Sequence, residues 1–512
     1  MSLWVQPLDP IGFLPLSCLA ALTPILSLIV ILCIFRAPSW RAVILSSTTC
    51  FAISLIIYRA PISIILSSYL YGLSFGFWPI SWIVVNAIFL YNVARECGCI
   101  DRLIEWMRNS LPINMGLYAI FIAFLLGGLI EGVDGYGFPI AISTTLLVSL
   151  GFKPIEAVCI SLIANTVTVP FASLGVPVET LSTVSNLDLK PICMYLSLYL
   201  ALISVATPIL IINIASNHDG DRRIYEAGLL SGITLAIFIY IVTIYMDPRL
   251  SGILAPIASI LTTILYVKVR FRCRIGYVGL DGWMPWIIVS VAMGFSNFTR
   301  LYRLFSFSIP VPSIHRSIYI PLYDSIVSAV YEVQPLAHGS LIFISAIIVA
   351  CIYKLKPSDV FRLYVYTWRR MMHAVVAIMG ILGLAFLMNY TGLSLTLGYT
   401  LSYTGLFYPL LSGFIGWIGT FVSGSETGSN ALFGNLQRMA AEISGITPYI
   451  TTSLNAAGGV LGKMVSLQSI AIGLSTVGLK DVEGVIMRKL IGYSLVLTLI
   501  LGLTTYIIIA LA

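Results

Sequence analysis

Charged side chains interrupt a few of the long apolar stretches of this sequence. Glu131, Asp134 and Glu426 lie in such stretches, and Lys463 lies in another. An ionised group is costly in hydrocarbon and persists there only beside a cavity or a partner, and burial raises the affinity of a carboxylate for protons. We therefore predict that these acids carry protons and that Lys463 neutralises an anionic ligand. The alternatives are loop tips in water for the acids and a side chain that extends to the membrane interface for Lys463.

Glycine is concentrated around the first two acids, at positions 127, 128, 132, 135 and 137. A backbone that leaves its helix inside a membrane exposes N–H groups that can hold an anion such as a carboxylate. Gly135, Tyr136 and Gly137 are the candidate binding positions at this tip. Close helix contact is the alternative for any single glycine.

Hydroxyl and amide side chains are dense around Glu426 and recur in other segments. We expect Asn165, Thr166 and Asn455 to cap or bridge the ends of broken spans, where they either contact a ligand or only join helices. The complete set of predicted substrate-binding residues is Gly135, Tyr136, Gly137, Asn165, Thr166, Ser425, Thr427, Ser429, Asn430, Asn455, Lys463 and Gln468.

The elements that position these residues are membrane-spanning helices. The chain has 512 residues, of which 59% are hydrophobic and 10% charged, whereas soluble domains carry about 25% charged residues. We predict an all-α polytopic membrane protein with about 12 to 14 membrane segments, and we expect the first of them to be retained rather than cleaved as a signal peptide. Apolar runs of about 18 to 25 residues, which can cross about 30 Å of hydrocarbon, include residues 11–35, 191–215, 224–246 and 490–512.

Basic residues indicate how these segments are oriented. Both termini should lie outside the cell membrane, and residues 300–337 should form the longest external connection. The formal charge of +7 is explained by cytoplasmic loops, so we predict membrane lipid and no nucleic acid among the partners. The basic loops that we place in the cytoplasm are residues 36–41, 95–108, 218–223, 268–274, 354–370 and 480–489.

Residues 126–177 and 416–468 share one design: an apolar run, a polar tip, a second apolar run and a span broken at an asparagine. In the predicted orientation the two stretches enter the membrane from opposite sides. Inverted repeats with discontinuous helices are typical of secondary transporters, which bind substrate where the broken ends meet. Within a single membrane transport domain, residues 1–512, we place the first hairpin and broken span at 111–190 and the second at 396–480. The remainder is scaffold.

The sequence does not indicate an enzyme. Its histidines, at positions 218, 315, 338 and 373, are too dispersed for a catalytic cluster, and its nine cysteines lack the spacing of a zinc site. We expect no cofactor and no metal site. A passive channel is the weaker alternative, because deep acids at repeat tips fit alternating access better than a continuous pore.

The sequence resembles the lactate permease family along nearly its whole length. The resemblance implies symport of L-lactate, D-lactate or glycolate, so that the partners are a small monocarboxylate and a proton. The family's first tip reads Glu-Gly-Ala-Ala-Gly-Phe-Gly, so Asp134 and Tyr136 replace an alanine and a phenylalanine, and Glu426 stands where aspartate is usual. The resemblance is carried by Trp78-Pro-Ile-Ser-Trp82 and, most densely, by residues 131–139, 151–154, 162–166, 423–435 and 455–470.

The family is also similar to a wider group of ion transporters with paired re-entrant hairpins, which implies elevator-like movement. Sodium coupling on the same scaffold stays open, because tips rich in asparagine and serine can coordinate sodium through carbonyl oxygens. The sequence does not determine the oligomeric state, and a homodimer is one of the alternatives.

Overall fold

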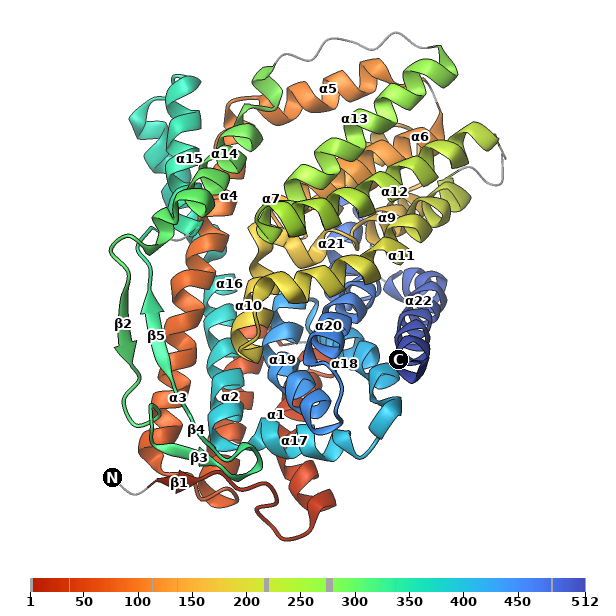
Figure 1. Cartoon of the computed structure of the whole chain (residues 1–512). Helices are drawn as coiled ribbons and strands as arrows, with labels where there is room; N and C mark the ends of the chain where they lie inside the picture. The colour runs from red at the N-terminus through yellow and green to blue at the C-terminus, as the bar shows by residue number, and fades with distance from the viewer. Residues whose placement is uncertain are drawn as a thin grey trace.

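A computed structural model of the chain describes residues 3–35, 37–112, 114–135, 137–215, 221–272, 280–336, 338–479 and 482–511 (Figure 1). Helices dominate it, as the apolar composition predicts. Their bounds are α1 Leu14–Cys33, α2 Ser39–Ile56, α3 Ile62–Phe75, α4 Trp82–Glu96, α5 Cys99–Ser110, α6 Met115–Tyr118, α7 Gly127–Val133, α8 Phe138–Ser149, α9 Pro154–Ala164, α10 Ala172–Ser185, α11 Leu189–Ala215, α12 Arg222–Tyr245, α13 Ser251–Phe271, α14 Met284–Thr299, α15 His338–Ile352, α16 Pro357–Thr391, α17 Leu393–Ser402, α18 Tyr408–Ser423, α19 Glu426–Ile443, α20 Pro448–Lys463, α21 Leu467–Thr476 and α22 Glu483–Leu511.

Many of these helices are long and apolar enough to cross a membrane. By length and composition the described residues contain 11 such helices, or up to 12 if the bent pair Pro154–Ala164 and Val169–Ser185 counts as one span. This confirms the predicted multi-span helical class. The number of spans in the described residues, 11 to 12, reaches only the lower bound of the predicted 12 to 14 segments. Some apolar helices, among them α8 and α15, are too short to be counted.

Two sets of packed helices frame the centre of the molecule. On one side α16 packs against α2, α3 and α4, and these helices run in the same general direction in Figure 1. On the other side α11, α12 and α13 pack in sequence order. Every residue from Gly116 to Val133, a range that includes α7, is buried, whereas most residues of α1 and α22 are half-buried or exposed. The helix that carries Glu131 is therefore central, and the first and last helices are peripheral.

Short strands occupy the predicted external connection. They are β2 Phe307–Pro310, β3 Ile318–Ile320, β4 Ser325–Ile326 and β5 Val330–Val333, together with β1 Trp4–Val5 near the N-terminus. β2 pairs with β5 in an antiparallel hairpin, β3 pairs with β4 in the same manner, and β1 joins β3 in parallel. The N-terminal segment is thus attached to the connection before α15.

Glycine allows the helices around the site to approach backbone to backbone. A Cβ placed on Gly416 would lie 1.9 Å from the carbonyl oxygen of Asn455, and one on Gly132 would lie 2.1 Å from that of Gly252. The contact between α18 and α20 and that between α7 and α13 therefore need glycine. In this structure Gly132 makes a close helix contact, not a break, and the helix ends only after Val133.

Candidate functional site

Glu131 is held between two polar partners from distant parts of the chain. Its Oε1 accepts a hydrogen bond from Nζ of Lys463 at 2.6 Å, and its Oε2 accepts one from Nδ2 of Asn165 at 2.7 Å. Glu131 is 0% exposed and Lys463 is 5% exposed. The sequence-predicted residues Glu131, Asn165 and Lys463 therefore meet in one buried cluster. Lys463 does not extend toward an interface in this structure.

Both partners of Glu131 sit where a helix stops. Asn165 is the C-cap of α9, and its backbone (φ −82°, ψ 61°) leaves the helix before the turn Val169–Phe171 leads into α10. Lys463 is the last residue of α20, and α21 begins at Leu467. A helix C-terminus carries partial negative charge, so the end of α20 stabilises the ammonium group of Lys463.

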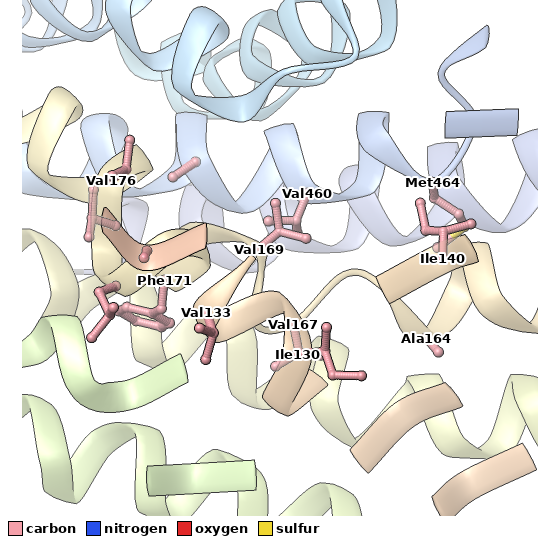
Figure 2. Packing of buried hydrophobic residues seen from close by; sticks show 14 of the residues in the cluster. Ile130, Val133, Ile140, Ala164, Val167, Val169, Phe171, Val176, Val460 and Met464 are labelled. Carbon is pink, nitrogen blue, oxygen red and sulfur yellow. The ribbon is translucent and has the colours of Figure 1, made fainter. Parts of the chain in front are cut away.

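Apolar side chains close around this break. Figure 2 shows Ile130 and Val133 of α7, Val167 and Val169 of the break, and Met464 just beyond Lys463. All of them are at most 2% exposed. An ion pair in such surroundings is screened little, and either charge alone would be expensive to bury.

Glu426 is the first residue of α19, which follows α18 after a short turn. Its neighbour Ser425 is the N-cap of α19, and the Ser425 hydroxyl accepts a hydrogen bond from the N–H of Gly428 at 3.2 Å. Glu426 is 3% exposed, and among the described residues neither of its carboxyl oxygens has a hydrogen-bond partner within bonding geometry. It is close enough to Lys463 and Glu131 to interact electrostatically with both. The structure thus places a second acid beside the ion pair.

A cavity of about 450 Å³ opens beside these groups. Lys463 and Glu426 both line it, and Gly135 and Gly137 line it from the first tip. Gly137 has a φ of +84°, a left-handed conformation that glycine adopts at little cost. Of the other predicted binding residues, Ser425, Thr427 and Gln468 also line the cavity. Both sequence stretches that were singled out as repeats therefore contribute to one cavity.

The amides of the second hairpin form a different arrangement. Nδ2 of Asn455 donates to Oδ1 of Asn430 at 2.9 Å, and Nδ2 of Asn430 donates to the carbonyl oxygen of Pro177 on α10 at 3.1 Å. Nε2 of Gln437 donates to Oδ1 of Asn455 at 3.1 Å. This amide chain, Gln437–Asn455–Asn430, joins α19 and α20 to α10. Its three residues are not among the described residues that line the cavity. The alternative that these asparagines only join helices therefore fits the structure.

The expected break at Asn455 is wrong. Asn455 lies inside α20, which continues to Lys463, and the chain leaves the helix only at residues 464–466. Its side-chain amide forms hydrogen bonds with the side chains of Asn430 and Gln437. It therefore does not need to bond the free backbone groups of a helix end. The break therefore falls after the lysine.

The remaining predicted residues are placed as follows. The hydroxyl of Thr166 donates to the carbonyl oxygen of Ile163 at 2.9 Å, and that of Ser429 donates to Gly416 at 3.1 Å, so both satisfy helix carbonyls. Asp134 is the C-cap of α7, is 1% exposed and lies within electrostatic range of Tyr91 on α4. It is absent from the described lining of the cavity. Tyr136 lies outside the described residues.

Some residues of this region were not anticipated. Ser173, Leu174 and Gly175 have φ values of +47°, +56° and +84°, a left-handed turn that is strained for serine and leucine. The hydroxyl of Ser173 accepts a hydrogen bond from the N–H of Gly135 at 3.2 Å, which ties the first tip to the start of α10. Gly175 and Pro177 were the available signals of irregular backbone here.

Comparison with known proteins identifies the family. The family profile described as L-lactate permease matches residues 17–512. The chain is 31% identical to the L-lactate permease of Escherichia coli (strain K12), with 99% of this chain and 98% of that protein covered. It is 30% identical to the glycolate permease GlcA of the same strain, with the same coverage, and 31% identical to the L-lactate permease of Bacillus subtilis (strain 168), with 98% of each covered.

Among solved structures there is a distant likeness to the Alcanivorax borkumensis YdaH transporter. The identity is 14% and the TM-score is 0.43, over 86% of this chain and 87% of that chain. The family assignment rests on the sequence relatives and the profile, which cover nearly the whole chain. The chain therefore belongs to the lactate permease family, and it is a multi-pass membrane transporter and not an enzyme.

Proposed function

We propose that this protein carries lactate, glycolate or a related small 2-hydroxy acid across the cell membrane together with a proton. The observation that carries the proposal is the buried pair of Lys463 and Glu131, at 2.6 Å, in which Lys463 lines a cavity that Glu426 also lines. The names of the relatives, L-lactate permease and glycolate permease, support a small monocarboxylate as the substrate.

Coupling follows from competition for one cation. Lys463 lines the cavity, yet its ammonium group is already bonded to the carboxylate of Glu131. A substrate carboxylate must take the place of Glu131, and Glu131 would then be a buried charge without a counter-charge, which is strongly unfavourable. A proton on Glu131 removes that cost. Binding of the anion and binding of the proton therefore favour each other, with one proton for each anion.

Glu426 completes the charge balance. A single ammonium group can offset one carboxylate, so Glu426 holds a proton while Glu131 is ionised, and its position on the cavity wall lets it exchange that proton with water. The substrate's hydroxyl group would be bound by Ser425, Thr427 or Gln468, which line the same cavity. Gly135 and Gly137, which line the cavity, would complete the site from the first tip.

Transport itself would use two inverted hairpins. The first hairpin and broken span, residues 111–190, and the second, residues 396–480, would move as one body against the remaining scaffold, in the manner of an elevator. The support for this division is that the Glu131–Lys463 pair crosses from one stretch to the other. Both termini would lie outside the cell.

Reconstituted vesicles test the coupling ion. Purified protein in liposomes should accumulate labelled lactate when an inward proton gradient is imposed, and a sodium gradient of equal size should have no such effect. Accumulation that follows sodium alone would replace the proton by sodium. No lactate uptake or exchange under either gradient would remove the proposed substrate class.

A further inference from the structure

The cavity beside Lys463 has two walls of opposite chemistry. Lys463, Glu426 and the tip of the second hairpin form the polar wall. The lining that comes from α1, α2 and α16 is mostly apolar, with Leu28, Val43 and Ile381 among its members and with Ser39 and His373 as polar ones. A ligand that fills such a space needs an anionic end and an apolar end.

Ile381 belongs to this apolar lining and contacts the first turn of α19. Its side chain is 8% exposed, and its Cδ1 lies 3.3 Å from where a Cβ on Gly428 would stand. Gly428 belongs to the first turn of α19, which begins with Glu426. Ile381 therefore packs against the first turn of α19, beside the groups that would hold a carboxylate and a hydroxyl.

The size of the cavity exceeds what the smallest acids need. A volume of about 450 Å³ falls in the range of about 300 to 1,000 Å³ that is typical of pockets for much larger ligands. A molecule as small as glycolate would leave the apolar wall in contact with water. Additional methylene groups on the ligand would cover that wall and gain hydrophobic free energy.

We propose that the site accepts 2-hydroxy acids with aliphatic chains longer than that of lactate, and that Ile381 sets the length it prefers. This inference rests on the proposed function and deepens it. The carboxylate and hydroxyl lie at the polar wall, and the aliphatic chain extends along α16 past Ile381. The site then selects among acids by the area of α16 that the aliphatic chain covers. This selection is separate from the exchange of charge partners at Lys463.

The test is a competition ladder in proteoliposomes. Exchange of labelled lactate is measured against unlabelled glycolate, lactate, 2-hydroxybutyrate and 2-hydroxyisocaproate. Each methylene covered by the wall should lower the inhibitory concentration about fourfold, which corresponds to about 0.8 kcal/mol. Two variants follow. Ile381→Phe should weaken the longer acids about tenfold relative to glycolate, as overpacking does, whereas Ile381→Ala should favour the longest acid.

Val376→Phe is the matched control, because Val376 lies on the same helix, is 40% exposed and is not among the described lining residues. It should leave the ladder unchanged. Retained exchange of glycolate shows that the Ile381 variants are folded. Two results would overturn the inference: equal inhibitory concentrations for all four acids in the unmodified protein, or a loss of affinity in Ile381→Phe that is the same for every acid. Lactate exchange in the unmodified protein would still support the proposed function in either case. If the unmodified protein exchanges no lactate, the proposed function itself fails.

Discussion

Nζ of Lys463 lies 2.6 Å from Oε1 of Glu131, although 332 positions separate them in the sequence. The lysine ends α20 and the glutamate lies in α7, so the contact joins the two stretches that the sequence marked as repeats. Removing one partner of a buried ion pair typically costs about 3 to 5 kcal/mol, because the other charge is left without compensation. The pair is therefore both a structural tie and a point at which charge can be exchanged.

Lys463→Ala should abolish lactate binding or weaken it severely. The substrate anion would lose the cation that the cavity offers beside Glu426, and Lys463→Arg should restore little because a guanidinium group differs in shape and hydration. Binding is measured as the shift in thermal unfolding that lactate produces. The double variant Lys463→Ala/Glu131→Gln is the control, because it removes the uncompensated charge and should recover stability without recovering binding. Unchanged affinity in Lys463→Ala would take this residue out of the site.

Asp134→Ala should keep transport and at most shift its dependence on pH. Asp134 is buried but is not part of the described cavity lining, and the family resemblance leads us to expect alanine there. Uptake of labelled lactate is compared with that of the unmodified protein over a series of external pH values. Loss of exchange in this variant would give Asp134 a direct role in the substrate site.

Asn455→Ala should destabilise the fold without changing which acids compete. It leaves Oδ1 of Asn430 and Nε2 of Gln437 without their bonds to Asn455 inside the protein, and each buried polar group left unpaired costs about 1 to 3 kcal/mol. Thermal unfolding in detergent and the competition pattern of surviving protein are the two measurements. A normal melting temperature with altered substrate preference would instead make Asn455 a ligand-binding residue.

An ion cluster in the turn between α12 and α13 should stabilise the protein down to low pH. Asp247, 2% exposed, contacts Arg249 at 3.2 Å and His338 at 3.3 Å, and Arg249 also pairs with Glu179. Burial alone would raise the pKa of Asp247, but Arg249 and His338 outweigh it and hold the pKa well below its usual range. Such a group contributes stability above its unfolded pKa of about 3.9, and the contribution is lost as pH falls through the lowered folded value.

The measurement is the melting temperature of Asp247→Asn against its parent, both in a His338→Gln background that removes titration of the histidine. The deficit of Asp247→Asn should be constant between about pH 5 and pH 8 and should shrink only below about pH 4. Arg249→Gln should cost about 3 to 5 kcal/mol at neutral pH. A deficit that already fades on acidification from pH 8 to pH 6 would contradict the ionised state of Asp247.

The sequence singled out Glu131, Asn165 and Lys463 one by one, since a charge or amide inside an apolar span stands out against its neighbours. The contact among these three residues could not be predicted, because a single sequence does not indicate which distant helices pack together. The break after Lys463 was missed because residues 464–466 are Met-Val-Ser, which carry no glycine or proline. The role of Ile381 could not be predicted from the sequence, because an apolar residue in an apolar helix does not differ from its neighbours.

The amide chain shows a further limit of sequence reasoning. Asn455 was placed at a helix break because a polar residue in a span often marks one, yet its partners Asn430 and Gln437 satisfy it inside a continuous helix. Such satisfaction depends on how α19 and α20 pack, which the local sequence does not show. Local composition therefore indicated where polar groups gather, and tertiary packing determined what each of them does.

The central claim, that a buried carboxylate carries the proton, is tested most directly by separating net transport from exchange. Glu131→Gln and Glu426→Gln are made singly and reconstituted, and lactate accumulation under a proton gradient is compared with lactate–lactate counterflow. At least one variant, with Glu131→Gln expected first, should lose accumulation and keep counterflow, because exchange cycles through the loaded states without net release of a proton. Accumulation at the unmodified level in both variants would show that neither carboxylate is the proton carrier.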